Sequence, residues 1–142
     1  MARRTKPVPS QNLKVDGVIG STQKDGIIFP SASRAAAAYN SNEYFATDAM
    51  GVRLYIDLTV VNGGTLTVKI QTKDPLTGNW VDVPGATTTA LAAVATTTLT
   101  LEPGVTETAN VDVAQSIGTS WRVVATTAVA AVTFSIGGEY LG

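Results

Sequence analysis

The sequence contains neither cysteine nor histidine, and this double absence removes several classes of chemistry. Disulfide bonds, thiol nucleophiles, Cys/His zinc sites and histidine general bases are all excluded. A catalytic site would have to be built from Asp, Glu, Lys, Arg, Tyr, Ser and Thr alone.

Charged residues are also scarce, at 15% of 142 residues with a net charge of -1. Binding to nucleic acid needs a surplus of Lys and Arg, so we expect no nucleic-acid partner. The first four cations, Arg3, Arg4, Lys6 and Lys14, all precede the first acidic residue, Asp16. Because a small monomer usually carries more surface charge, we expect part of this surface to be buried in an oligomer or against a larger lattice.

Long apolar runs are missing as well. The basic N-terminus is not followed by the apolar core of a signal peptide, and no run approaches the roughly 20 residues that span a bilayer. We therefore expect a protein that is made in the cytoplasm, stays soluble there and has no membrane partner.

The hydrophobic share is 44%, and much of the remainder is Thr, Gly, Ala, Ser and Asn. Thr and Val fit a pleated surface, so this composition is typical of a sheet protein. The length suits one domain with an appendage. We predict an extended N-terminal arm at residues 1–16 and a β-sandwich domain at residues 17–142.

The arm has no repeating apolar pattern, and Pro7 and Pro9 favour an extended path of up to about 50 Å. It has three interpretations: a disordered tail, a nucleic-acid contact or a docking strap. Three cations near the start are few for nucleic acid, whereas apolar anchors suit a protein groove, which favours the strap. The residues predicted to contact a capsid or a neighbouring subunit are Arg3, Arg4, Lys6, Pro7, Val8, Pro9 and Leu13.

Two short apolar pieces, Val18-Ile19 and Ile27 to Phe29, are expected to form a hairpin or a pair of edge strands that closes at Pro30. In residues 31–51, Ser33 is a candidate cap for one helical turn through Ala35 to Ala38, and the remainder resembles a loop.

Residues 52–61 alternate apolar and polar side chains, Asn62-Gly63-Gly64 suits a tight turn, and 65–71 alternate again. This pattern predicts a β-hairpin. A second turn at 74–79 leads into a strand at 80–83, which is expected to pair with the strand before it.

Further strands are predicted at 96–101, 109–113, 121–126 and 132–136. About eight short strands at this spacing favour an antiparallel β-sandwich, in a jelly-roll or related arrangement. The predicted core is Leu54, Ile56, Leu58, Leu66, Val68, Ile70, Val81, Leu99, Leu101, Val123, Phe134 and Ile136.

The acidic residues offer little chemistry. Asp57 and Asp82 resemble paired glycosidase carboxylates only if they face one another across neighbouring strands, and their place on alternating polar faces favours solvated surface positions. Asp74 is one carboxylate in a Pro-Gly turn, whereas calcium takes roughly six to eight oxygens. We expect a non-enzymatic protein without cofactor or metal.

Aromatic residues make up only 6% of the chain. They have two interpretations: a sugar-binding platform, or packing in the core and at subunit contacts. The residues concerned are Trp80, Trp121, Tyr39, Tyr44, Phe45 and Tyr55.

Three segments between Gly51 and Leu141 carry a resemblance to a known family. They are GVRLYIDLTVVNGGTLTVKIQTKDPLTGNWVDVPG, LTLEPGVTETANVDVAQSIGTSWRVVAT and VTFSIGGEYL. They resemble the head decoration, or cement, proteins of tailed bacteriophages.

The resemblance implies a virion protein on the outer surface of an assembled capsid, made in the host cytoplasm. It further implies a homotrimer whose partner is the lattice of the major capsid protein, with arms that grip adjacent subunits. Two alternatives remain open, a phage tail or fibre module and a carbohydrate-binding module.

Overall fold

Alternating apolar residues build two sheets that pack face to face, and apart from the short β8 all their strands pair antiparallel. The computed structural model describes residues 26–142. The strands are β1 (Ile27–Arg34), β2 (Ala38–Asn40), β3 (Tyr44–Phe45), β4 (Gly51–Val60), β5 (Thr65–Lys73), β6 (Trp80–Thr87), β7 (Ala95–Leu101), β8 (Asp112–Val113), β9 (Ser120–Ala128) and β10 (Val132–Leu141). Among the described residues there is no helix long and apolar enough to cross a membrane.

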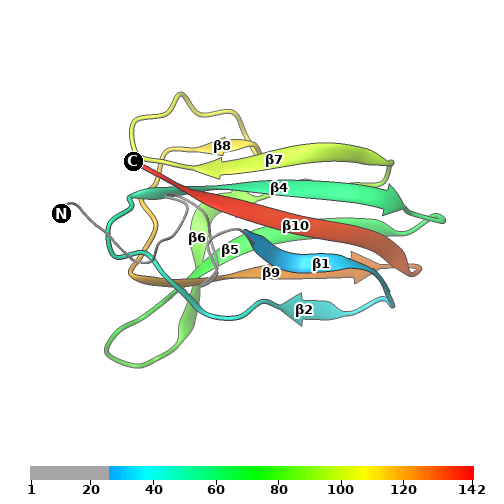
Figure 1. Cartoon of the computed structure of the whole chain (residues 1–142), viewed down its shortest axis with the longest axis horizontal. Coiled ribbons are helices and arrows are strands. Elements are labelled where there is room, and N and C mark those ends of the chain that lie inside the picture. The colour runs from blue at the N-terminus through cyan, green and yellow to red at the C-terminus, as the bar shows by residue number, and fades with distance from the viewer. Residues whose placement is uncertain (1–25) are drawn as a thin grey trace.

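The first sheet has the order β1-β10-β4-β7-β8, and the second has the order β2-β9-β5-β6 with β3 also paired to β9 (Figure 1). Apart from the short β3 and β8, the strands pair in a nested series: β1 with β10, β2 with β9, β4 with β7 and β5 with β6. This series is a long antiparallel pair rolled up, which is the jelly-roll arrangement. The predicted all-β, jelly-roll-like sandwich is therefore confirmed.

The core lies between the two sheets and follows the predicted alternation. Eleven of the twelve predicted core residues are buried, and all except Val81 have relative exposures of 1% or less. Phe134 packs edge-on against Phe29, with ring centroids 5.9 Å apart. Val81 is the exception at 52% exposed, because it lies on the edge strand β6, and Val83 is the buried residue there.

The predicted hairpin of residues 52–71 is wrong, although its turn is right. Asn62 and Gly63 have positive φ angles of 46° and 81°, and the Gly64 N–H donates to the Val61 carbonyl at 2.6 Å. However, β4 and β5 belong to different sheets and do not pair. The turn carries the chain across the sandwich, so both strands direct their apolar faces into one core. The strand at 80–83 does pair with β5 as predicted.

The edge strand β1 confirms part of the prediction for residues 17–30. Ile27 to Phe29 lie in it, whereas Val18-Ile19 lie outside the described residues. The strand does not close at Pro30 but continues to Arg34, with register shifts on either side of Phe29. Proline is tolerated there because an edge strand leaves N–H positions unpaired.

The predicted helical turn at Ala35 to Ala38 is absent from the described structure. Ser33 lies in β1 and does not cap a helix, and residues 35–37 form the turn that leads to β2. The Thr127 hydroxyl holds this turn: it donates to the Ala35 carbonyl at 2.7 Å and accepts from the Ala37 N–H at 3.0 Å. Four alanines are too few to form a stable helix without tertiary contacts, so these contacts decide the conformation.

Arg34 closes the adjacent edge of the core. Its guanidinium lies 4.5 Å from the ring centroid of Phe134 and 5.3 Å from that of Phe29. It also donates to the carbonyls of Pro30 at 2.6 Å and Phe134 at 3.0 Å. Burial lowers the pKa of Arg34 from its ordinary value. The arginine thus binds the bulged edge strand β1 to β10.

The later strands are largely as predicted, with two differences. The strand expected at 109–113 is reduced to β8, which runs parallel to β7. Asn110, with a φ of 67°, turns the chain immediately before it. In contrast, β10 continues past Ile136 through Gly137 and Gly138 to Leu141 and pairs with β4 throughout.

Candidate functional site

The seven predicted arm contacts, Arg3, Arg4, Lys6, Pro7, Val8, Pro9 and Leu13, lie outside the described residues and remain predictions. The described chain begins at Gly26, whose carbonyl accepts a hydrogen bond from the Gly138 N–H at 2.8 Å. The first described residue therefore lies beside β10.

The outer face of the second sheet carries a connected group of polar residues around one tryptophan. We call it the Trp80 strip; it consists of Trp80, Arg122, Gln71, Asp82 and Lys69. Strand pairing places Trp80 opposite Lys73 and Asp82 opposite Gln71, while Gln71 also lies opposite Arg122 of β9. Three strands therefore bring these side chains together.

The contacts in the Trp80 strip are specific. The Arg122 guanidinium lies 4.4 Å from the ring centroid of Trp80, and its Nε donates to Gln71 Oε1 at 2.9 Å. Gln71 Nε2 in turn donates to Asp82 Oδ1 at 2.8 Å, and Lys69 Nζ lies 3.1 Å from the same oxygen. The indole, guanidinium and amide are thus held in fixed positions on an accessible face.

Hydrogen bonds favour the charged form of Asp82 within the strip. The hydrogen bond from Gln71, and then that from Lys69, lowers the pKa of the Asp82 carboxyl below its ordinary value. Lys73 Nζ lies 3.3 Å from Glu43 Oε1 and 5.7 Å from the ring centroid of Trp80. Such an arrangement can bind a polar ligand by stacking and hydrogen bonding.

The outer face of the first sheet carries a smaller polar group. Arg53 lies 3.6 Å from Glu139, and Tyr55 donates a hydrogen bond to the same carboxylate. Asp57 accepts a hydrogen bond from the Thr96 hydroxyl at 3.1 Å. The side chains of Arg53 and Glu139 are 38% and 39% exposed, so this face is a solvated sheet surface on which such pairs contribute about 1 kcal/mol or less.

The structure separates the acidic residues that the sequence singled out. Asp57 belongs to the first sheet and Asp82 to the second, so they do not face one another across neighbouring strands. Asp74 holds its own turn by accepting hydrogen bonds from the Leu76 N–H at 2.8 Å and the Thr77 hydroxyl at 3.0 Å. Within residues 26–142 no group of acidic side chains is arranged to hold a metal ion.

The six aromatic residues do not form one platform. Trp80 and Tyr55 lie on the outer faces of opposite sheets, while Tyr39 packs against the core and donates to the Ala35 carbonyl at 2.6 Å. Phe45 is exposed. Of these six residues in the described chain, Trp80 is the one whose ring is covered by cationic side chains, those of Arg122 and Lys73.

Trp121 is fully buried and forms the centre of an aromatic cluster. Its ring centroid lies 5.1 Å from that of Tyr44 and 5.9 Å from that of Tyr140. The indole N–H donates to the Tyr140 hydroxyl at 3.3 Å, and this hydroxyl donates to the Phe45 carbonyl at 2.8 Å. Burial raises the pKa of both tyrosines. The core interpretation is therefore right for Trp121.

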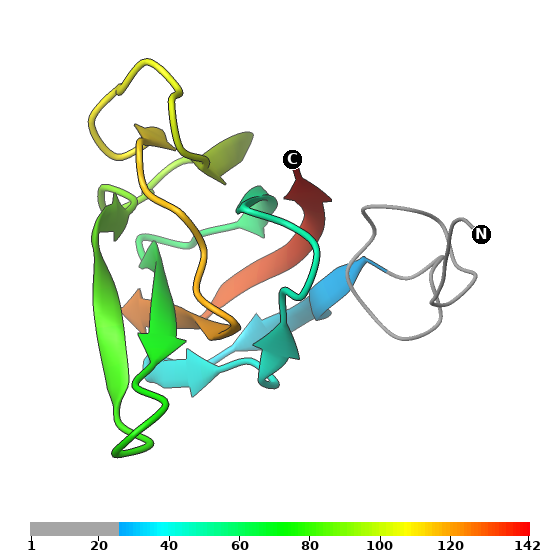
Figure 2. The same ribbon diagram turned by 90° about the vertical axis from the view of Figure 1, so that its left-hand side faces the viewer.

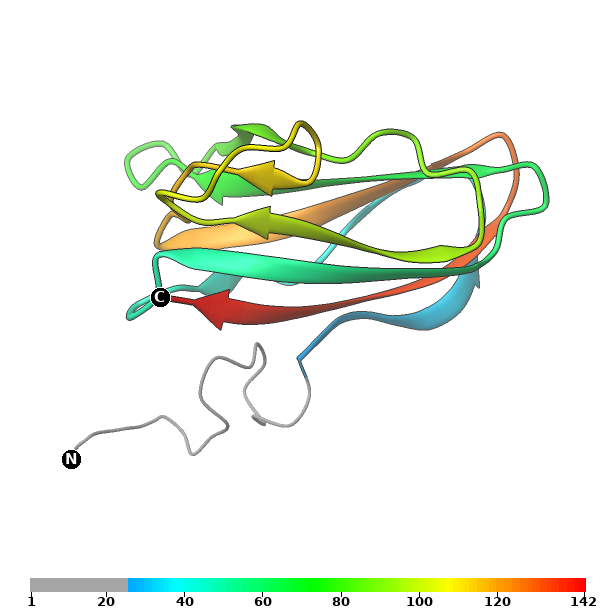
Figure 3. The same cartoon turned by 90° about the horizontal axis from the view of Figure 1, so that it is seen from above.

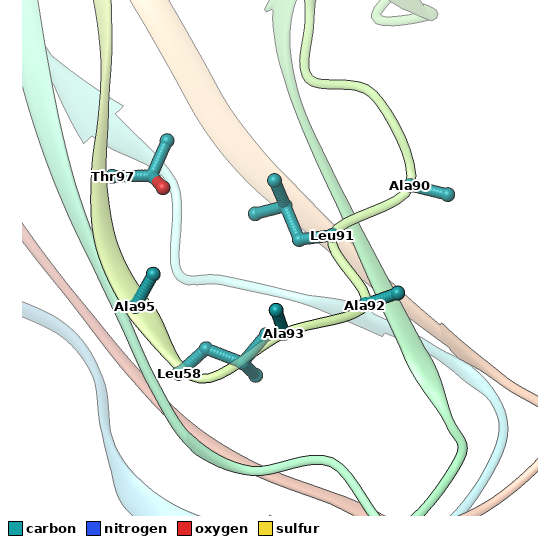
Figure 4. A pocket seen from close by; sticks show the side chains of 7 residues that line it. All are labelled: Leu58, Ala90, Leu91, Ala92, Ala93, Ala95 and Thr97. Carbon is teal, nitrogen blue, oxygen red and sulfur yellow. The ribbon is translucent and has the colours of Figure 1, made fainter.

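An apolar cleft of about 200 Å³ opens between β4, β7 and the chain that precedes β7 (Figure 4). Leu91 points into it, and its backbone forms an isolated bridge with Leu66 of the second sheet. This cleft was not predicted from the sequence. The feature of the sequence that could have indicated the cleft is the run of alanines around Leu91. The residues that line the cleft are Leu58, Ala90, Leu91, Ala92, Ala93, Ala95 and Thr97.

Comparison with known proteins assigns no family. No protein-family model matches the chain, and no curated protein matches it. Among solved structures, the chain is similar to a chain in the structure of infectious bursal disease virus Gt strain, with a TM-score of 0.44 and 13% sequence identity. The similarity covers 80% of this chain and 31% of that chain. Similarity of this degree does not assign a function.

Proposed function

We propose that this protein is a structural virion component that binds the outer surface of an assembled bacteriophage capsid and stabilises it. The observation that carries the proposal is the coincidence of resemblance and fold. Residues 51–141, which resemble decoration proteins, build strands β4 to β10 of the jelly roll. Jelly rolls recur in viral coat proteins, although the fold alone does not assign a function.

In the proposed mechanism the sandwich is a rigid body and the arm supplies the grip. Arg3, Arg4 and Lys6 meet acidic capsid surface, while Pro7, Val8, Pro9 and Leu13 lie along a groove. A homotrimer presents three arms, so its effective concentration at the lattice is high even where each contact is weak. A protein that binds only the assembled lattice stabilises that lattice by linkage.

Cosedimentation with expanded phage capsids, and separately with unassembled capsid subunits, tests this proposal. We expect binding to capsids alone, together with a higher disruption temperature of the capsid. Absence of wild-type binding to capsids would reject the decoration role.

Reversing the arm charges in one variant, Arg3→Glu, Arg4→Glu and Lys6→Glu, is expected to weaken capsid binding by about tenfold to a hundredfold per arm, because three exposed pairs are lost. The matched control is Lys69→Glu on the outer face of the second sheet, which we expect to bind normally. Equal affinity of the arm variant and the wild type would contradict the strap mechanism.

The Trp80 strip supports a second candidate function, carbohydrate binding. An accessible indole flanked by a guanidinium and an amide combines a stacking surface with hydrogen-bond donors, and lectin domains also use jelly rolls. Trp80→Ala is then expected to abolish binding on a glycan array with little change in melting temperature. Tyr55→Ala, on the opposite sheet, is the control. A wild-type protein that binds no glycan contradicts this candidate.

A further inference from the structure

Four connections meet at one end of the sandwich, and none of them contains a charged residue. They are residues 35–37, 61–64, 88–94 and 129–131, and we call them the uncharged end. Strand register brings them together, since Val60 lies opposite Thr133, Thr65 opposite Ala128 and Leu58 opposite Ala95. Figures 1 and 3 show these turns together, on the right in both views.

The opposite end of the sandwich is different in character. Its connections carry Glu43, Asp48, Asp74, Glu102 and Glu107. Figure 2 shows this end facing the viewer. Arg34 directly precedes residues 35–37, but its guanidinium is engaged with backbone carbonyls and two phenylalanine rings. Charge is thus distributed unequally along the length of the sandwich.

The uncharged end also exposes large apolar side chains. Val129 is 84% exposed, Val94 is 62% exposed and Val60, at the end of β4, is 40% exposed. Val94 lies at the rim of the apolar cleft: its chain neighbours Ala93 and Ala95 line that cleft, whereas Val94 itself is exposed. The end is therefore a methyl-covered surface with a cleft beside it.

Val129 occupies a backbone conformation that its side chain disfavours. Its φ is 74°, and the Ala130 N–H donates to the Ala128 carbonyl at 2.9 Å, which makes a tight three-residue turn. Positive φ is a genuine outlier for a β-branched residue, and the positive-φ γ-turn is rare and strained. Gly, Asn or Asp would fit this turn better. The strained residue instead places an apolar side chain at the tip, where folding alone does not require one.

We propose that the uncharged end is a self-association surface through which copies of this chain meet around a rotation axis. The inference deepens the proposed function, which includes a homotrimer but gives it no surface.

Symmetry favours a second copy as the occupant. A residue that lies close to a rotation axis approaches its own equivalent in the neighbouring copies. A charged residue near the axis would face the same charge, and such juxtaposition is unfavourable. The uncharged end avoids this repulsion, and its exposed valines supply the apolar centre that self-association surfaces have.

Sedimentation velocity of the full-length protein over a concentration series, without capsids, tests the proposal. We expect the wild type to be a closed oligomer. Val129→Asp and Val94→Asp are each expected to raise its dissociation constant about tenfold or more, because a charge is then repeated around the axis. Asp accepts positive φ more readily than Val, so Val129→Asp should keep or raise the melting temperature of the subunit.

The matched control is Leu76→Asp, which introduces the same charge at an apolar residue that is 90% exposed in the turn between β5 and β6 at the opposite end. We expect its oligomer to be unchanged. A monomeric wild type would overturn the proposal, including one that instead binds uncharged phosphatidylcholine vesicles. Association that resists both valine substitutions would also overturn it. Because no capsid is present in this experiment, its result does not depend on whether the protein binds capsids.

Discussion

Replacing Trp121 with alanine is expected to lower the free energy of unfolding by about 3–5 kcal/mol, the usual cost of removing a large buried aromatic side chain. Trp121 is fully buried, contacts Tyr44 and Tyr140, and donates a hydrogen bond to the Tyr140 hydroxyl. Its loss removes packing from β3, β9 and β10 together. Urea denaturation followed by far-UV circular dichroism measures the change.

Trp80→Ala is the matched control for this prediction, because the two tryptophans lie in different environments. Trp80 packs on the outside of the second sheet, where its contacts are Arg122 and Lys73. Its replacement is expected to change the free energy of unfolding by about 1 kcal/mol or less. If Trp121→Ala were no more destabilising than Trp80→Ala, the aromatic cluster would not contribute to the core as the geometry implies.

Gly51→Ala is expected to be the most damaging change of a single methyl group, at about 1–3 kcal/mol or more. A Cβ at Gly51 would lie 2.3 Å from the Leu101 carbonyl oxygen and 3.1 Å from Glu102 Cα. Both are backbone atoms, so relief requires the ends of β4 and β7 to move apart. Thermal and urea denaturation should both show the loss.

Gly118→Ala provides the comparison. A Cβ there would meet the side chain of Thr72, with a closest distance of 3.0 Å. A side chain can rotate or shift where a paired strand cannot, so the expected loss is smaller than for Gly51→Ala. Equal losses for the two variants would show that the β4–β7 separation is more adjustable than the close approach indicates.

Alternation in the sequence predicted most strands and most of the core, because a period of two directly reports which face of a strand is buried. It does not report to which sheet a strand belongs. Leu58 and Leu66 point into the same core from opposite sheets, although a tight turn joins their strands. A hairpin and a turn that crosses between sheets give the same alternation of apolar and polar residues. The predicted pairing of residues 52–61 with 65–71 failed because this alternation does not report which strands pair.

Local pattern failed for a different reason at Ala35 to Ala38. Alanine favours helix, but the conformation there is decided by Thr127, about 90 positions away in the chain. Val81 shows a third limit, since a strand at the edge of a sheet leaves an inward position uncovered. In each case the local sequence pattern lacks information on contacts between residues that are distant in the chain.

The candidate sites were predictable only in part. Polar positions on alternate strand residues indicated that Asp57 and Asp82 are solvated, and this is confirmed. The meeting of Trp80 with Arg122 depends on sheet order, because 42 positions separate them. The clustering of uncharged turns likewise emerges only from the register. The arm contacts remain predictions from residue character.

The nested pairing of strands has a consequence for the order of folding. Strand β10 lies between β1 and β4 in the first sheet, yet it is the last of the three to be synthesised. Until residues 132–141 leave the ribosome, β1 has no partner strand in the sheet, and β4 lacks one of its two partner strands. Pairs so distant in sequence close slowly, and unpaired edges invite contact with other chains. This jelly roll therefore closes its first sheet only after β10 has been synthesised, and until then β1 and β4 present unpaired edges on which a chaperone could act.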